Sequence, residues 1–264
     1  MEHLMQNGEQ QGRAAEGDAD YALRIDGLTV EFGPAHRPAR VVNDVTYDLK
    51  PGETLGIVGE SGSGKSVHVL ASVGLIPSPP ARIVGGRVMF EGRDLLGLSR
   101  NALSTVRGKG IGFVFQDPMT SLNPYLTIGR QLTEAMEAHL SLTATQIEAR
   151  AVELLNMVRI TEPKTRLKQF PHQLSGGMRQ RVMIAMALAC EPKILIADEP
   201  TTALDVTSQS QVVQIVNSLK DELGMSVIWI THDLGVVAGI ADTIQVMYAG
   251  HIVERGPTEV VFSD

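Results

Sequence analysis

The fold of this 264-residue chain is decided by the sequence Gly59-Glu60-Ser61-Gly62-Ser63-Gly64-Lys65-Ser66. It matches the pattern G-x-x-x-x-G-K-[ST] at every fixed position, between an apolar strand-like run at 55–58 and a helical pattern at 64–75. Glycines let successive backbone N–H groups point at one phosphate, and the following helix adds its positive end. We therefore predict that Lys65 reaches the β- and γ-phosphates and that the Ser66 hydroxyl binds Mg²⁺. The alternative is a glycine-rich turn with an incidental lysine.

A second motif is the apolar run at 194–197, which ends in Asp198 and Glu199. A buried strand with this pattern delivers a carboxylate to the edge of the sheet beside the phosphate loop. We expect Asp198 to hold Mg²⁺ through water. We expect Glu199, which faces the other way, to polarise an attacking water. Taken alone, the run is equally compatible with a strand that has a solvated acidic end.

Two further polar residues follow strand-like segments. Gln116 comes after 111–115, and its amide can reach Mg²⁺ and the attacking water. His232 ends the segment 227–231 and can contact the γ-phosphate. Most glutamines are merely surface residues and a lone histidine is more often structural, so both assignments depend on the first two motifs.

A second anion-binding helix terminus is predicted near residue 175. Ser175 is a suitable N-cap, and Gly176 and Gly177 leave backbone N–H groups uncovered. This terminus and the phosphate loop fall in different lobes of the chain. A head-to-tail dimer would bring each terminus onto the nucleotide of the other chain, whereas the simpler alternative is a capped helix without a ligand.

Composition excludes several classes of protein. Lys and Arg total 23 and Asp and Glu total 30, a formal net charge of −7, which argues against nucleic acid as a partner. Cys190 is the single cysteine, so an internal disulfide and a cysteine-ligated metal are excluded. No apolar run approaches the roughly 18 residues that a membrane span requires.

Strand and helix patterns alternate after residue 190 and predict an α/β fold with a mostly parallel sheet. Residues 117–180 are instead helical, which predicts an α-helical lobe inserted into that core. We expect helices over 128–158 and 179–190. Residues 1–20 are rich in Gly, Gln, Glu and Ala, and we expect a flexible N-terminal tail followed by one domain over 21–264.

These motifs, in this order, resemble the ATP-binding cassette (ABC) family over residues 22–264. Ala203-Leu204-Asp205 is similar to the family's D-loop, and Phe32 falls where the family places an aromatic residue on adenine. The resemblance implies a P-loop NTPase with a RecA-like core, an N-terminal antiparallel β subdomain and an inserted helical subdomain. It implies ATP and Mg²⁺ as cofactors and Glu199, His232 and Gln116 as catalytic residues. The implied metal ligands are Ser66, Gln116 and Asp198. The implied nucleotide-binding residues are Phe32, Gly59, Glu60, Ser61, Gly62, Ser63, Gly64, Lys65, Ser66, Val67, Ser175, Gly176, Gly177, Gln180 and Asp205.

Two segments, 116–124 and 174–207, resemble more closely the peptide/nickel group of bacterial import ATPases, first-subunit type. This implies a peripheral ATPase on the cytoplasmic face of the plasma membrane. Its implied partners are a second homologous ATPase, two integral-membrane permeases and an extracytoplasmic solute-binding protein. The expected cargo is a di- or oligopeptide. Nickel, glutathione or oligosaccharide uptake and a non-transport ABC ATPase remain alternatives, and a P-loop kinase or an ATP-binding regulator without turnover is a weaker one.

The C-terminal end departs from this group. Its members usually continue beyond the equivalent of Phe262 with a tail that, in many of them, holds an iron–sulfur cluster through cysteines. Here the sequence stops at Asp264, so a truncated chain or a short member is expected. With Cys190 alone, we expect no iron–sulfur cluster in this chain.

Overall fold

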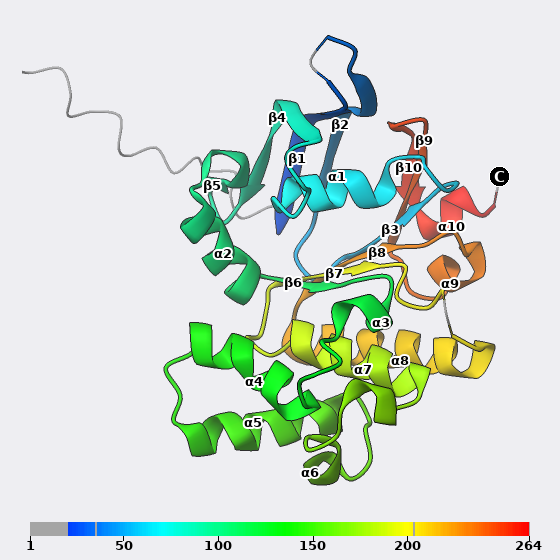
Figure 1. Ribbon diagram of the computed structural model, residues 1–264. Helices are drawn as coiled ribbons and strands as arrows, with labels where there is room; N and C mark the ends of the chain where they lie inside the picture. Colours follow the sequence, from blue (N-terminus) through cyan, green and yellow to red (C-terminus); the bar gives the residue numbers. More distant parts are fainter. Residues whose placement is uncertain (1–20, 35, 203, 264) are drawn as a thin grey trace, which may run out of the picture.

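Two β-sheets lie one above the other in the computed structural model, which describes residues 21–34, 36–202 and 204–263 (Figure 1). The expected tail at 1–20 lies outside the described residues. The main sheet has six strands in the order β10-β9-β3-β8-β7-β6. Its strands are β3 (Thr54–Val58), β6 (Ile111–Val114), β7 (Ile194–Asp198), β8 (Ser226–Ile230), β9 (Thr243–Tyr248) and β10 (His251–Pro257). All neighbours pair in parallel except β10, which is antiparallel to β9.

The central strands β3, β7 and β8 are buried along their whole length, because both faces of the main sheet are covered. In β7, Leu195 contributes to the core cluster on the helical side, whereas Ile194 and Ile196 contribute to the cluster on the opposite side. This alternation places Asp198 on the same face as Ile196. The strand therefore directs its terminal carboxylate toward the side on which α1 (Lys65–Ser72) lies.

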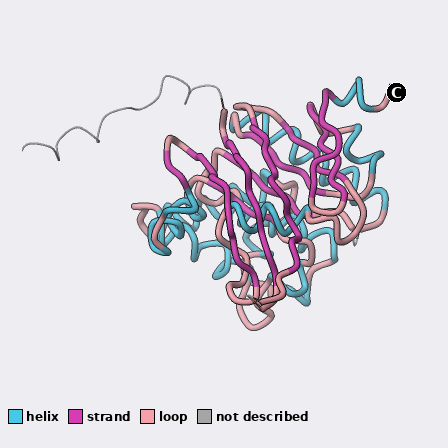
Figure 2. Tube along the Cα trace, turned by 90° about the horizontal axis from the view of Figure 1, so that it is seen from above, coloured by secondary structure: helices cyan, strands magenta, loops and turns pink. Residues whose placement is uncertain are grey.

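The second sheet is antiparallel, in the order β2-β1-β4-β5. Its strands are β1 (Leu23–Phe32), β2 (Ala39–Leu49), β4 (Ala81–Phe90) and β5 (Arg93–Asp94). Figure 2 shows its long strands side by side from above. Buried residues of this sheet, of α1 and of the upper face of the main sheet form one hydrophobic cluster, so α1 is packed between the two sheets.

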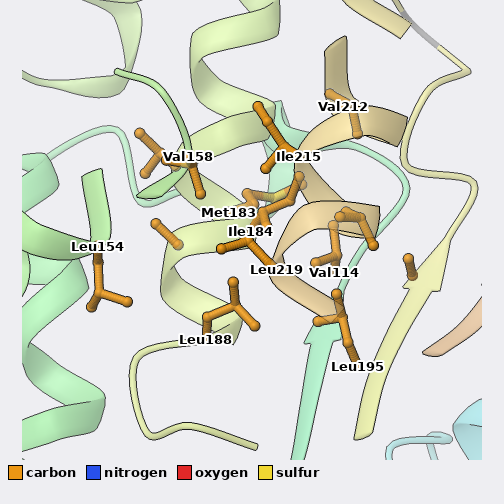
Figure 3. Packing of buried hydrophobic residues seen from close by; sticks show 14 of the residues in the cluster. Val114, Leu154, Val158, Met183, Ile184, Leu188, Leu195, Val212, Ile215 and Leu219 are labelled. Atoms are coloured by element: carbon orange, nitrogen blue, oxygen red, sulfur yellow. The ribbon is translucent and has the colours of Figure 1, made fainter. Parts of the chain in front are cut away.

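Helices cover the other face of the main sheet. Those between β6 and β7 are α3 (Pro118–Ser121), α4 (Ile128–His139), α5 (Ala144–Met157), α6 (Pro163–Arg166) and α7 (Gly176–Ala187), with a 3₁₀ turn at Pro171–Gln173. The long helix α8 (Val206–Leu223) follows β7, and α9 (Leu234–Ala238) and α10 (Thr258–Val261) come later. Figure 3 shows side chains of α7 and α8, among them Ile184 and Leu219, converging with Val114 and Leu195 of the sheet.

Several predicted element bounds were wrong. The helical pattern at 128–158 is two helices, since Thr143 forms a capping box with Gln146 and starts α5 anew. The helix expected over 179–190 is Gly176–Ala187: it begins directly after Ser175, the residue also predicted as its N-cap, and ends before Cys190. Helix α2 (Arg100–Lys109) was not predicted. Only Val106 of this helix is buried, and few apolar residues mark it in the sequence.

Candidate active site

The loop at 59–66 connects β3 to α1 and is shaped by glycines. Gly59 has φ +152°, and a Cβ there would lie 2.2 Å from the Met247 carbonyl oxygen. Gly64 has φ +100°, and a Cβ there would lie 2.7 Å from the Val41 carbonyl oxygen. Side chains are therefore excluded at both positions. The backbone is held close to β9 and β2, and the Ser63 N–H donates to the Glu60 carbonyl oxygen at 3.2 Å.

Lys65 and Ser63 are buried within this loop. The Lys65 ammonium donates to the carbonyl oxygens of Gly59 at 2.8 Å and Glu60 at 2.9 Å. Burial lowers the pKa of Lys65. Ser63 Oγ is buried and has no hydrogen-bond partner among the described residues. An orphaned hydroxyl and a buried cation in one glycine-rich loop fit a phosphate group.

Ser66 and Asp198 meet at the start of α1. The Ser66 hydroxyl donates to Asp198 Oδ1 at 2.8 Å. Burial raises the pKa of Asp198, and the hydrogen bond from Ser66 opposes that shift. Within the described ranges no group of three or more His, Cys, Asp or Glu could hold a metal alone. One carboxylate and one hydroxyl nevertheless fit Mg²⁺, which takes few protein oxygens and completes its shell with phosphates and water.

Glu199 is the centre of a polar cluster at the ends of β6, β7 and β8. Its φ of +44° takes it out of the strand geometry of β7. Its Oε2 accepts from Gln116 Nε2 at 2.9 Å and from Thr202 Oγ1 at 2.9 Å. His232 Nδ1 lies 3.4 Å from the same oxygen. The three sequence-predicted catalytic residues, Glu199, Gln116 and His232, are therefore brought together.

Sequence reasoning missed Thr202 and His68. Thr202 lies three residues after Glu199 in a turn, and that spacing is the signal that could have identified it. His68 is completely buried in α1, and burial lowers the pKa of its imidazole to about 4. The imidazole is therefore neutral near pH 7. In the sequence, His68 lies on the buried face of α1 together with Lys65, Val69 and Ser72, so its position is that of an ordinary core residue.

The helix terminus at residue 175 is built as predicted but lies apart from the loop. Ser175 Oγ accepts from Met178 N at 3.3 Å. A Cβ on Gly177 would lie 3.2 Å from Ser208 Oγ, whereas one on Gly176 would meet nothing within 4 Å. Gln180 is 1% exposed, and its Nε2 has no partner within the part of the chain that is described.

Three further predicted nucleotide-binding residues lie elsewhere: Asp205 at the start of α8, and Phe32 and Val67 beside the hydrophobic cluster between the two sheets. Asp205 caps α8, accepting from Ser208 N at 2.9 Å and Ser208 Oγ at 2.8 Å, so it lies beside the α7 terminus. Its neighbour Ala203 lies outside the described residues. Phe32 and Val67 are partly buried and pack against the cluster between the two sheets. Packing against this cluster is what the structure shows for both side chains.

These features define a class of protein. A glycine-rich loop between β3 and α1, a buried carboxylate on Ser66 and a second carboxylate held by Gln116 define a P-loop nucleoside triphosphatase. Residues 42–202 match the model of the ABC transporter family. The chain belongs to this family, whose ATP-binding subunits hydrolyse ATP.

Known relatives cover most of the chain. The oligopeptide transport ATP-binding protein OppD of Bacillus subtilis (strain 168) is 52% identical over 242 residues, which are 92% of this chain and 68% of the relative. OppD of Escherichia coli (strain K12) is 48% identical over 248 residues, 94% of this chain and 73% of the relative. The dimeric, post-hydrolysis structure of the cassette MJ0796 bound to ADP and phosphate superposes with a TM-score of 0.80. It is 29% identical and covers 89% of this chain and 98% of its own.

None of the helices in 21–34, 36–202 and 204–263 is long and apolar enough to cross a membrane.

Proposed function

We propose that this chain is the ATP-hydrolysing subunit of a bacterial importer of dipeptides or oligopeptides, bound to the cytoplasmic face of the plasma membrane. The observation that supports this most strongly is its similarity, over more than nine-tenths of its length, to relatives named for oligopeptide transport. An intact set of polar residues around Glu199 supports turnover rather than mere nucleotide binding.

In the proposed reaction the loop and Lys65 hold the β- and γ-phosphates of ATP. Glu199 accepts the proton of the attacking water as the new P–O bond forms and the bond to the leaving ADP oxygen breaks. The hydrogen bonds from Gln116 and Thr202 keep the Glu199 carboxylate in one orientation. His232, whose side chain is 57% exposed, is free to donate to the γ-phosphate. Phe32 is the proposed contact of the adenine ring.

Ser66, Asp198 and Gln116 are the residues that we propose to hold Mg²⁺. Bound there, the ion would neutralise charge on the transferring phosphoryl group. The burial that raises the pKa of Asp198 also makes its carboxylate a strong partner for a cation, since few waters compete with it.

The α7 terminus is proposed to act on a second subunit. The side chains of Ser175 and Asp205 accept hydrogen bonds from Met178 and Ser208, not from Lys65. The open space beside Gly176 and the orphaned amide of Gln180 are typical of a site that binds a ligand. In a head-to-tail dimer with a homologous ATPase, this terminus would cover the γ-phosphate bound to the partner's loop. The dimeric architecture described for MJ0796 supports this arrangement.

Docking to two permease subunits is proposed at a groove beside Gln116. Phe113, Phe115, Ala135, Met186 and Cys190 line a cavity of about 280 Å³. Phe115 is 42% exposed, and Met119 and Tyr125 on the following segment are more exposed still. Apolar surface of this kind marks a protein contact. Its continuity with Gln116 would link ATP hydrolysis to the permease, while a solute-binding protein delivers the peptide outside.

Uptake in the native cell tests the proposal. We would compare wild type with Glu199→Gln, and with the exposed-carboxylate control Glu153→Gln, in a strain without other peptide uptake systems. Labelled dipeptides, longer peptides and nickel are supplied separately. Loss of peptide uptake only in Glu199→Gln supports a peptide importer. Loss of nickel uptake alone, or unchanged uptake of every solute, would contradict it.

A further inference from the structure

His68 is a buried titratable residue that the proposed mechanism leaves without a role. It lies in α1 three residues after Lys65 and has no exposed surface. Both of its ring nitrogens have a polar neighbour. Nδ1 lies 3.2 Å from the carbonyl oxygen of Gly64, and Nε2 lies 3.2 Å from the hydroxyl of Tyr47.

The direction of these two hydrogen bonds follows from chemistry. The Gly64 carbonyl can only accept, so Nδ1 of the neutral ring must bear the proton and donate it. Nε2 is then an acceptor, and the Tyr47 hydroxyl donates to it. Tyr47 is 3% exposed, and its ring meets that of His68 edge-on, with centroids 5.8 Å apart and planes at 78°. A single tautomer is therefore selected.

Gly64 is the residue at which the phosphate loop becomes a helix. Its φ of +100° is left-handed, and the backbone N–H of His68 also donates to its carbonyl, at 3.0 Å. The two residues that follow, Lys65 and Ser66, are those proposed to hold phosphate and Mg²⁺. One histidine thus fixes the carbonyl at this junction with two donors.

Tyr47 extends this connection to the other sheet. It belongs to β2 of the antiparallel sheet, which also contains Phe32, the proposed adenine contact. The chain Tyr47–His68–Gly64 is the hydrogen-bonded route by which a side chain of that sheet reaches the end of the phosphate loop.

We propose that His68, oriented by Tyr47, is a positioning residue for ATP binding that holds Gly64, and with it Lys65 and Ser66, in the phosphate-binding conformation. The alternative is that His68 is only a core residue whose loss lowers stability. Ser72 is a matched control, because it is 1% exposed, belongs to α1 and donates its buried hydroxyl within the helix, to the Val69 carbonyl at 2.8 Å.

The experiment measures binding of a fluorescent ATP analogue with Mg²⁺ to the full-length chain, alongside thermal unfolding. His68→Leu removes both hydrogen bonds, and we expect affinity to fall about tenfold, the effect of losing roughly 1.4 kcal/mol. His68→Asn retains a donor at the position of Nδ1, and we expect it to restore affinity to within about threefold of wild type. Tyr47→Phe should weaken binding by about threefold, because His68 loses the partner that orients it.

Ser72→Ala should lower the unfolding temperature as much as Tyr47→Phe does but leave affinity unchanged. Adding Tyr47→Phe to His68→Leu should cause no further loss of affinity, since both act through one route. Equal affinity for His68→Leu and wild type, or equal losses for His68→Leu and Ser72→Ala, would overturn the proposal. Should His68→Leu fail to fold, unchanged affinity in Tyr47→Phe would overturn it as well. None of these outcomes depends on the identity of the transported solute.

Discussion

The two phosphate-binding ends of this molecule differ in how complete they are. At the end of β3, Ser66 of the loop already donates to Asp198 at the end of β7, and Gln116, after β6, donates to Glu199. At the start of α7, Ser175 Oγ accepts from Met178 N of its own helix, and Ser208 is what a Cβ on Gly177 would meet first. The first end is assembled by the fold of one chain. The second presents uncovered N–H groups and the orphaned amide of Gln180, and the proposed function requires a partner chain to use them.

This difference separates effects on catalysis within one chain from effects that require a dimer. Substitutions at the assembled end should change the chemistry of the chain's own nucleotide. Substitutions at the α7 end should change hydrolysis only to the extent that hydrolysis requires a dimer of two chains. A residue distant from both ends should alter stability alone.

The largest effect is expected for Glu199→Gln at the assembled end. The amide cannot accept a proton from water, so hydrolysis should fall by about 10²–10⁴-fold. ATP affinity should stay within about threefold of wild type, because Lys65 and the loop are untouched. Phosphate release and size-exclusion chromatography with ATP measure the two consequences, since the unreacted dimer should accumulate. Turnover equal to that of wild type would exclude Glu199 as the base.

An intermediate effect is expected at the α7 end, where the chain offers a matched pair of helix caps. Ser175 accepts from Met178 N and Ser99 accepts from Ala102 N, each at 3.3 Å. Replacing either serine by alanine should lower the free energy of unfolding by about 1 kcal/mol. Ser175→Ala should in addition lower hydrolysis about tenfold, as expected for a lost hydrogen bond to a charged phosphate.

Urea unfolding and ATP hydrolysis, measured over a range of protein concentrations, distinguish the two caps. We expect the deficit of Ser175→Ala in hydrolysis to be greatest where dimers form. Identical hydrolysis by Ser175→Ala and Ser99→Ala would show that the α7 terminus is a capped helix without a ligand.

The smallest effect is expected for an ion pair outside both ends. Arg255 Nη1 donates to Asp48 Oδ1 at 3.0 Å and joins β10 to β2. The Arg255 guanidinium lowers the pKa of Asp48 below its ordinary value of 3.8. Because the folded-state pKa is the lower one, this stabilisation is present above pH 3.8 and disappears as the pH falls through the folded-state pKa. With side chains 29% and 40% exposed, the pair should contribute less than about 1 kcal/mol.

Asp48→Asn should therefore lower the free energy of unfolding slightly at pH 7, and this difference should shrink as the pH falls below 3.8 through the folded-state pKa of Asp48. Hydrolysis should be unchanged, because no atom of this pair contacts either phosphate-binding end. Chemical unfolding at several pH values measures the first effect and phosphate release the second. A large loss of hydrolysis in Asp48→Asn would show that stability and catalysis are not separable in this way.

Local sequence determined the elements of the assembled end. The spacing of Gly59, Gly64 and Lys65 specifies a loop whose shape depends on backbone freedom, and this can be recognised in eight residues. The apolar run before Asp198 specifies a strand buried on both faces. Ser175 as an N-cap was likewise predicted, because capping involves residues only three apart.

Tertiary structure alone decided which of these residues meet. Gln116 and Glu199 are 83 positions apart, and only the pairing of β6 with β7 brings their side chains within 2.9 Å. Strand β4 (Ala81–Phe90) follows β3 of the main sheet and helix α1 along the chain. It nevertheless pairs with β1 in the antiparallel sheet. Tyr47 and His68 had the periodicity of ordinary core residues, and their hydrogen bond exists because α1 is packed between two sheets. Backbone conformation and burial pattern are properties of short segments, whereas contacts between distant polar groups depend on strand order, which the pattern of one strand does not encode.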